Sequence, residues 1–251
     1  MTANMIDNMT TNMTANMTDN MTAKQSQVVT AAQMRDLEFY TINKMGVPSI
    51  VLMERAALAC TDRLKHGDFN LSNCVCLCGT GNNGGDGIAI ARLLHLNGHT
   101  TSIVLVGDID RLSTDAAQQL AIAQNYGVPL LHYIPGMLCD AQLATHNNIQ
   151  PTTIVDAIFG IGLSRPVEDL FLSAIKEVNA LSHTNCKILS VDIPSGVCTD
   201  TGEALGASIN ASATVTFAFI KRGLTLSVGK IAAGELTVAD IGIYDFNCLS
   251  S

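Results

Sequence analysis

The sequence predicts an α/β protein with a mainly parallel, doubly wound sheet that carries helices on both faces. Short apolar segments alternate with segments of helical periodicity through most of the chain, the order expected when helices link parallel strands. Hydrophobic residues make up 47% of the chain and charged residues 14%, which suits a sheet buried on both faces. At 251 residues, we expect one large domain rather than two small ones.

Residues 1–24 differ in composition from the rest of the chain. The triplet Asn-Met-Thr recurs with a period of four, beginning at Asn8, Asn12, Asn16 and Asn20. Because asparagine and threonine form helices poorly, we expect a disordered low-complexity tail, followed by the folded domain over residues 25–251. The triplets also fit the N-glycosylation pattern, which matters only in a secreted protein.

Two helices are expected before the first strand of the sheet. Thr30 and Gln33 form a capping-box pattern that opens a helix ending near Met45, and Ser49 begins a second helix that runs to about Lys65. Apolar segments then predict strands at Cys74–Cys78, Ser102–Val106, Pro129–Ile134, Thr153–Ala157, Lys187–Val191, Thr214–Phe219 and Leu236–Ala239. Further helices are expected near residues 87–97, 113–125 and 168–182.

Composition also limits the partners and the compartment. A formal net charge of −8 argues against nucleic acid or an anionic membrane as the main partner. We find neither an apolar run long enough to span a membrane nor the pattern of a secretory signal, so we expect a soluble protein. The eight cysteines include no C-x-x-C pair, and Cys74, Cys76 and Cys78 alternate along one predicted strand as small buried residues. Reduced, structural cysteines favour the cytoplasm.

The most informative segment is a glycine-rich turn, residues 78–87, between a predicted strand and a predicted helix. Gly79, Gly81 and Gly84 fit the dinucleotide-binding pattern G-x-G-x-x-G, and Asp108 lies near the place of a ribose-binding acid. That match alone is weak, because a carboxylate at Asp86 would repel phosphate. The turn therefore indicates a polar or metal-assisted ligand.

A second interpretation of this turn stays open. Asn82, Asn83 and Asp86 are residue types that cap helices and stabilise tight turns, and they would then have no ligand to bind.

Three polar loops follow predicted strands, at residues 78–87, 156–166 and 192–196, and we expect them at one edge of the sheet, where doubly wound sheets bind ligands. Asp156 and Asp192 end or directly follow strongly apolar strands. A carboxylate buried there is costly unless it has a hydrogen-bond or charged partner. Together with Asp86 they would repel one another without a cation or a donor-rich ligand. Oxygen ligands favour an alkali or alkaline-earth ion over zinc. The alternative is that each aspartate caps a turn.

Two basic residues lie near the same loops. Arg165 is able to bind phosphate through its forked guanidinium group, or it pairs only with Glu168 or Asp169 on the next helix. Lys221 follows a predicted strand and either faces the same cleft or is simply solvated.

These segments together resemble a known family. The blocks at 78–87, 155–166, 191–196 and 234–242 look like the signature blocks of the YjeF N-terminal domain family, the NAD(P)H-hydrate epimerases, and 33–35 and 48–56 look like its opening helices. The resemblance covers about 28–244 in the right order. It implies a Rossmann-like three-layer α/β/α sandwich, usually a homodimer, that interconverts the R and S epimers of hydrated NADH and NADPH (NADHX and NADPHX).

The resemblance also implies roles for individual residues. Asn83, Asp156 and Ser195 are expected to bind a potassium ion. The implied substrate-binding residues are Asn82, Asn83, Gly84, Gly85, Asp86, Gly160, Ile161, Gly162, Leu163, Ser164, Arg165, Pro166 and Asp192. The catalytic role follows instead from the reaction, which needs proton transfer: Asp192 is expected as the acid or base, because a positioned carboxylate is the simplest device for it, with Lys221 as a weaker candidate to assist it.

Departures from the family pattern are few. Thr80 stands where proline is usual and Ala57 where glycine is usual, and neither is an expected ligand. Many bacterial relatives continue into an ADP-dependent dehydratase domain, so we expect this chain to act with a separate NAD(P)H-hydrate dehydratase. We also expect an exposed hydrophobic patch on the first two helices to form the dimer surface.

Two other functions are weighed against the epimerase. The same domain resembles parts of scaffold proteins, so a non-catalytic ligand-binding module is the second hypothesis. A dinucleotide oxidoreductase is the third, and the acidic turn and the lack of a separate substrate domain argue against it.

Overall fold

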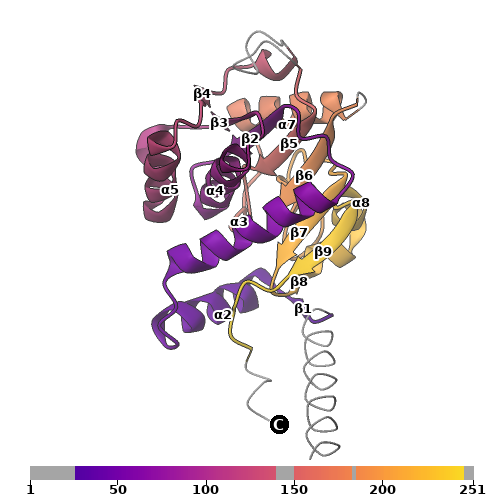
Figure 1. Cartoon of the computed structure of the whole chain (residues 1–251). Coiled ribbons are helices and arrows are strands. Elements are labelled where there is room, and N and C mark those ends of the chain that lie inside the picture. Colours follow the sequence, from indigo (N-terminus) through magenta and orange to yellow (C-terminus); the bar gives the residue numbers. More distant parts are fainter. Residues whose placement is uncertain (1–25, 140–149, 183–184, 246–251) are drawn as a thin grey trace, which may run out of the picture.

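Seven parallel strands form the centre of the structure, a computed structural model that describes residues 26–139, 150–182 and 185–245. The strands lie in the order β4-β3-β2-β5-β6-β7-β9 (Figure 1). The predicted tail of residues 1–24 lies outside the described residues. The strands are β2 (Cys74–Cys78), β3 (Thr101–Leu105), β4 (Leu130–His132), β5 (Thr153–Ala157), β6 (Lys187–Val191), β7 (Ala213–Phe217) and β9 (Glu235–Ala239).

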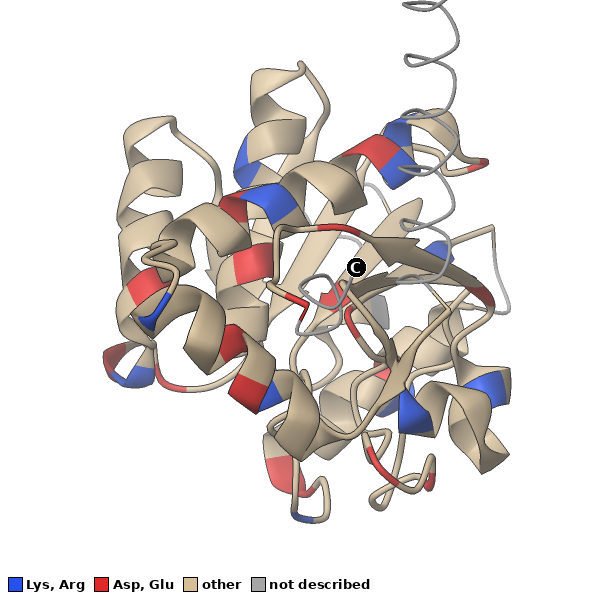
Figure 2. Ribbon diagram, turned by 90° about the horizontal axis from the view of Figure 1, so that it is seen from below, with Lys and Arg blue, Asp and Glu red and all other residues tan. Residues whose placement is uncertain are grey.

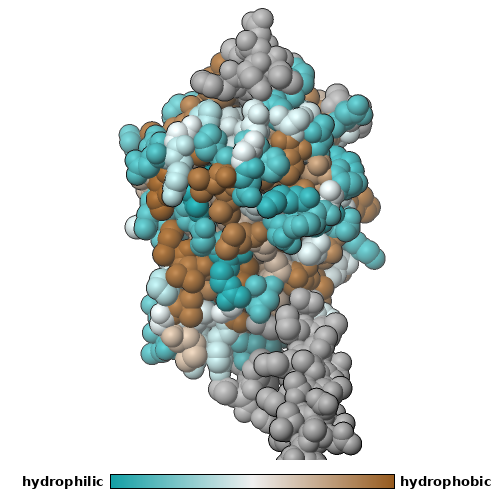
Figure 3. Space-filling view, viewed as in Figure 1, coloured by the Kyte–Doolittle hydropathy of each residue, from teal (hydrophilic) through white to brown (hydrophobic). Residues whose placement is uncertain are grey.

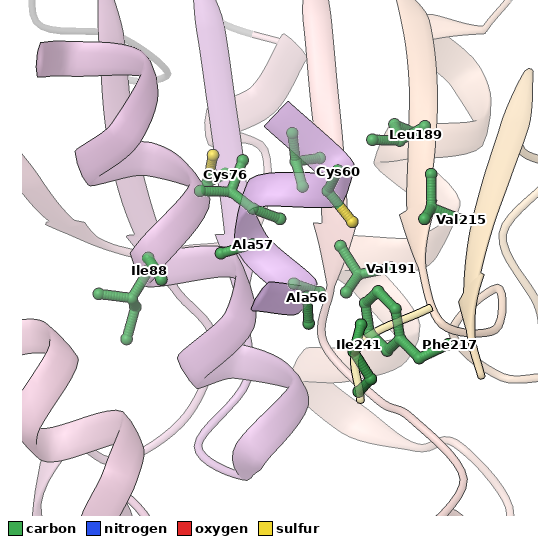
Figure 4. Packing of buried hydrophobic residues seen from close by; sticks show 14 of the residues in the cluster. Ala56, Ala57, Cys60, Cys76, Ile88, Leu189, Val191, Val215, Phe217 and Ile241 are labelled. Atoms are coloured by element: carbon green, nitrogen blue, oxygen red, sulfur yellow. The ribbon is translucent and has the colours of Figure 1, made fainter. Parts of the chain in front are cut away.

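Helices cover both faces of this sheet, which confirms the predicted three-layer α/β/α sandwich. One face buries Cys76 and Val191 against α3 and α4 (Figure 4), and the other buries Leu77 and Ile154 against α7. The helices are α2 (Ala31–Asn43), α3 (Ser49–His66), α4 (Asn82–Leu96), α5 (Thr114–Asn125), α7 (Asp169–Leu181) and α8 (Ser227–Ala232). Short 3-10 helices lie at Ile109–Arg111, Met137–Cys139 and Arg222–Thr225.

The strand order reverses between β2 and β5. The chain runs outward from β2 through β3 to β4, and then returns to pair β5 with the other side of β2. Loops that leave the carboxyl ends of two such neighbouring strands turn to opposite faces, which opens a crevice between them. The turn after β2 and the loop after β5 are two of the three polar loops selected from the sequence.

The cysteines of β2 behave as predicted. Cys74, Cys76 and Cys78 are fully buried free thiols on the face that packs against α3 and α4. Burial raises the pKa of the Cys74 thiol to about 12, so it stays protonated and unreactive at neutral pH. Within the described residues, no helix has both the length and the apolar character needed to cross a membrane.

Helix α4 begins five residues earlier than the sequence prediction near residue 87. Its first turn starts at Asn82, so Gly84, Gly85 and Gly87 are helical rather than part of a preceding loop. A Cβ atom on Gly84 would lie 1.8 Å from the carbonyl oxygen of Gly79, and one on Gly87 would lie 2.5 Å from the Cβ atom of Ala157. The glycines therefore allow the start of α4 to approach the sheet more closely than side chains would permit.

A short parallel pair outside the main sheet was not predicted. β1 (Val28–Val29) pairs with β8 (Ile220–Lys221), which places the start of α2 beside the segment that carries Lys221. The predicted capping box is confirmed at the same place, since the Thr30 side chain accepts from the Gln33 backbone and the Gln33 side chain accepts from the Thr30 backbone.

Replacing Gly84 with alanine is expected to destabilise the protein by roughly 2–3 kcal/mol, because the new methyl group collides with backbone that cannot move away cheaply. Chemical denaturation measures the change. Gly81→Ala is the matched control in the same turn, because nothing lies within 4 Å of its added Cβ atom. Its cost should stay below about 1 kcal/mol. Equal costs for the two variants would contradict the close-approach explanation.

Candidate active site

A cavity of about 510 Å³ opens at the carboxyl edge of the sheet. Its walls come from α2 and α3, the turn after β2, the loop after β5, the start of the loop after β6, and the segment that follows β7. This volume lies in the range of small-molecule sites. Figure 2, which views the molecule from below Figure 1, shows acidic residues on several of the helices and loops on this side.

The predicted substrate-binding residues divide into two groups. Gly84 and Gly85 are buried within α4 and Pro166 is exposed, and none of these three is among the residues that line the cavity. The predicted residues that do line it are Asn82, Asn83, Asp86, Gly160, Ile161, Gly162, Leu163, Ser164, Arg165 and Asp192.

Arg165 lines the cavity from the loop after β5. Among the described residues no ion pair joins it to Glu168 or Asp169, so the alternative of purely local pairing is not what the structure shows. Its side chain is exposed at the rim, where a guanidinium group is free to meet an anionic ligand.

Asp156 joins two of the site loops beneath the cavity. Its carboxylate accepts hydrogen bonds from the Ser190 hydroxyl at 2.7 Å, the Ser195 backbone at 2.9 Å and the Ser195 hydroxyl at 2.5 Å. Burial raises the pKa of the Asp156 carboxyl, although the hydrogen bonds from Ser195 and Ser190 oppose that effect. Asp156 and Ser195 are both fully buried, so they support the cavity without lining it.

Asn83 projects from the first turn of α4 and lies beside Gly160 of the neighbouring loop. A Cβ atom on Gly160 would come within 3.3 Å of the Asn83 side chain. Within the described residues the Asn83 amide nitrogen is buried without a hydrogen-bond partner. A buried polar group in that condition is costly unless a ligand or water satisfies it.

Asp192 and Lys221 form the most buried ion pair of the site. Asp192 directly follows β6, and its φ of 67° is a left-handed value that aspartate adopts more readily than most residues. Its carboxylate accepts from the Lys221 ammonium at 2.5 Å, the Phe217 backbone at 3.2 Å and the Thr216 hydroxyl at 3.3 Å. Lys221 is 1% exposed and also donates to the Phe217 carbonyl at 2.7 Å. The alternative of a solvated Lys221 is therefore wrong.

Three further carboxyl groups surround this pair. Glu38 on α2, Asp86 on α4 and Asp115 on α5 all line the cavity. Burial raises the pKa of Asp86 well above its ordinary value, and repulsion from Asp192, Glu38 and Asp115 raises it further, with Lys221 opposing. Burial likewise raises the pKa of Glu38, with Asp192 as the next cause. The cavity thus gathers carboxyl groups around one buried ammonium, an arrangement suited to proton transfer.

Sequence analysis missed Glu38 and Asp115. The available signal for Glu38 is its spacing on α2, because it follows Met34 by four residues and the two side chains share one side of the helix. Nothing in the sequence indicated that Asp115 belongs to the site. It lies in the first turn of α5, two residues after the N-cap Ser113, where acidic residues are common because they interact favourably with the helix dipole.

Comparisons with known proteins agree with this architecture. Residues 49–223 match the family model described as YjeF-related protein N-terminus. An NAD(P)H-hydrate epimerase of Limosilactobacillus reuteri (strain DSM 20016) is 46% identical over 220 residues, covering 87% of this chain and 97% of the relative. An NAD(P)H-hydrate epimerase of Weissella koreensis is 45% identical over 219 residues, covering 87% of this chain and 93% of the relative.

A solved structure supports the fold independently. The crystal structure of yeast ynu0, YNL200c, has a TM-score of 0.68 at 22% identity and covers 84% of this chain and 87% of that chain. The site geometry, the family model and these relatives lead to one conclusion: the chain belongs to the family of YjeF-related N-terminal domains.

Proposed function

We propose that this protein interconverts the R and S epimers of hydrated NADH and NADPH. Relatives named NAD(P)H-hydrate epimerase are 46% identical over nearly their whole length, and the cavity offers groups that such a reaction needs. The observation that carries the proposal is Asp192, a carboxylate that lines the cavity and is held there by the buried Lys221. A scaffold would not require such a costly buried arrangement.

The reaction inverts one carbon of the hydrated ring and requires proton transfer to and from oxygen. The reacting carbon of the hydrated ring carries a hydroxyl group and adjoins the ring nitrogen, so inversion means losing and regaining that hydroxyl or opening and closing the ring. Either route moves a proton to or from oxygen. Asp192 is positioned for this role because its backbone and three hydrogen-bond donors fix its carboxylate at the cavity wall.

We also propose a potassium ion held by Asn83, Asp156 and Ser195. Within the described residues no three His, Cys, Asp or Glu side chains gather in a metal-binding arrangement, so the site depends on amide and hydroxyl oxygens beside one carboxylate. Ser195 Oγ accepts from the Phe159 backbone at 2.9 Å and donates to Asp156, which leaves it one lone pair for a cation. Asn83 would bind the ion through its side-chain oxygen, because its unsatisfied amide nitrogen is a hydrogen-bond donor and needs an acceptor such as water or the substrate. When bound, the ion would supply positive charge beside the carboxyl groups of the cavity.

The remaining proposals concern assembly and surroundings. Phe39, Val51 and Leu58 on α2 and α3 are exposed large hydrophobic residues, and Figure 3 shows hydrophobic side chains gathered on the face that carries α3. These residues suit a homodimer surface. We also propose that the protein is cytoplasmic and acts with a separate NAD(P)H-hydrate dehydratase.

Asp192→Asn is expected to lower the rate of epimer exchange by about 100-fold or more, the usual contribution of a general acid or base, while the fold is retained. The measurement follows the ratio of separated epimers by chromatography after either pure epimer is added. Asp110→Asn serves as the matched control, because Asp110 is exposed and outside the cavity. Unchanged exchange in the Asp192 variant would remove that residue from the mechanism.

Exchange is also expected to depend on potassium, and Ser195→Ala should raise the potassium concentration for half-maximal rate by about 10-fold, an effect of about 1.4 kcal/mol. Ser190→Ala separates the two roles, since Ser190 donates to Asp156 but is not a proposed ligand. The half-maximal concentration should change little in that variant. A rate independent of potassium, or an equal response of both variants, would count against the ion site.

A further inference from the structure

We propose that Glu38 is a second catalytic residue, which donates a proton on the face of the substrate opposite Asp192. This inference rests on the proposed epimerisation and deepens it for the route in which the hydroxyl group is lost and regained, because that route uses one proton-transfer group on each face of the ring.

The position of Glu38 gives the first part of the argument. Glu38 lines the cavity from α2, which lies beside the carboxyl edge of the sheet rather than within the strands and crossovers that supply Asp192 and Asp86 (Figure 1). Glu38 thus enters the cavity from α2, whereas Asp192 and Asp86 enter it from the elements that belong to the sheet and its crossovers. Glu38 and Asp192 line the same cavity, and the charge of Asp192 raises the pKa of Glu38.

The helix that carries Glu38 is held firmly. Its first residue, Ala31, donates a backbone hydrogen bond to the Asp200 carboxylate at 2.8 Å. Near its other end Thr41 is buried, and the Thr41 hydroxyl accepts from the Tyr244 backbone at 2.9 Å. Contacts at both ends of α2 fix the direction from which Glu38 enters the cavity. A group that transfers a proton must be held in a fixed position relative to the substrate.

The two carboxyl groups differ in their partners. Asp192 is paired with the Lys221 ammonium group at 2.5 Å and also accepts hydrogen bonds from Thr216 and Phe217. Glu38 has no hydrogen bond or ion pair to any described residue, and burial and the charge of Asp192 both raise its pKa. A pair of carboxyl groups whose environments differ in this way divides naturally into one base and one acid.

Several charged groups surround Glu38 and set its pH response. Repulsion from Asp192 and Asp115 raises its pKa, and the Lys221 ammonium lowers it in part. The other charged groups that line the cavity are Arg35 on the same helix, Asp86 on α4 and Arg165 on the loop after β5.

The proposed step conserves every atom and electron. Glu38 gives its proton to the hydroxyl oxygen, the carbon–oxygen bond breaks with its electron pair as water leaves, and the lone pair of the ring nitrogen forms a carbon–nitrogen double bond. A water molecule on the other face adds to the same carbon, the double-bond pair returns to nitrogen, and the added water gives its proton to Asp192. Glu38 is then ionised and Asp192 protonated, which is the state in which the opposite epimer reacts.

Glu38→Gln is expected to lower kcat for epimer exchange by about 100-fold with little change in KM. Asp36→Asn, an exposed acid on the same helix, is the matched control for loss of one negative charge. Because burial disfavours the ionised Glu38, the Gln variant should be at least as stable as the wild type at neutral pH, and thermal melting checks this. Glu38→Asp keeps a carboxyl group and should recover part of the lost rate.

Two readouts separate proton donation from a structural role. The wild-type rate should fall as the pH rises through the elevated pKa of Glu38, and this fall should be absent in Glu38→Gln. In water labelled with oxygen-18, each inversion should place one solvent oxygen on the ring. Wild-type exchange without label incorporation would overturn the step written above.

These experiments test the role of Glu38 separately from the proposed epimerase function. A wild-type protein that shows no exchange would overturn the proposed function. Normal wild-type exchange with a Glu38→Gln rate within about 3-fold of it would overturn only the role of Glu38. A loss confined to KM, or a loss that keeps the wild-type pH profile, would also overturn it.

Discussion

The buried ion pair between Asp192 and Lys221 is the interaction on which the site depends. Glu38, Asp86 and Asp115 line the same cavity as Asp192. Ionised carboxyl groups that are partly removed from water repel one another strongly. Lys221 lies within this set, 1% exposed, and bonds both Asp192 and the backbone of Phe217. Its charge offsets part of the repulsion, and burial and mutual repulsion keep the pKa of Glu38 and Asp86 raised. One ammonium thus pairs with Asp192 while the pKa values of Glu38 and Asp86 stay raised.

The sheet topology brings these groups to one place. The strand order reverses between β2 and β5, and the polar loops leave from the carboxyl ends of β2, β5 and β6. Glycines let α4 begin close to the ends of these strands, and Asp156 in β5 bonds Ser190 in β6 and Ser195 in the loop after β6. The crevice is therefore a consequence of strand order, and its chemistry is a consequence of the few residues at the strand ends.

Much of the fold was predictable because buried strands leave a simple pattern. β2 and β5 begin and end as predicted, since uninterrupted apolar runs between polar turns have few other structures available. The start of α4 was predicted too late, because glycine and asparagine have low helix propensity. The glycines are accommodated in the helix because it packs closely against Gly79 and Ala157, a tertiary contact that the sequence does not show. The pair of β1 and β8 was missed because two-residue strands carry no periodicity.

The candidate site was predictable only where loops follow strands. Asp192 and the loop after β5 line the cavity, whereas Glu38 and Asp115 lie on helices distant in sequence and reach the same cavity only through tertiary packing. No local pattern could show that Lys221 is buried, since its environment comes from β1, β7 and the loop that carries Asp192.

A double-mutant cycle on the ion pair tests the central claim most directly. Unfolding free energies are measured by chemical denaturation for the wild type, Lys221→Met, Asp192→Asn and the double variant. Lys221→Met should cost about 3 kcal/mol or more in the wild type, because it leaves a buried carboxylate without its partner. In the Asp192→Asn background the same change should cost at least about 1 kcal/mol less. An equal cost in both backgrounds would contradict the account.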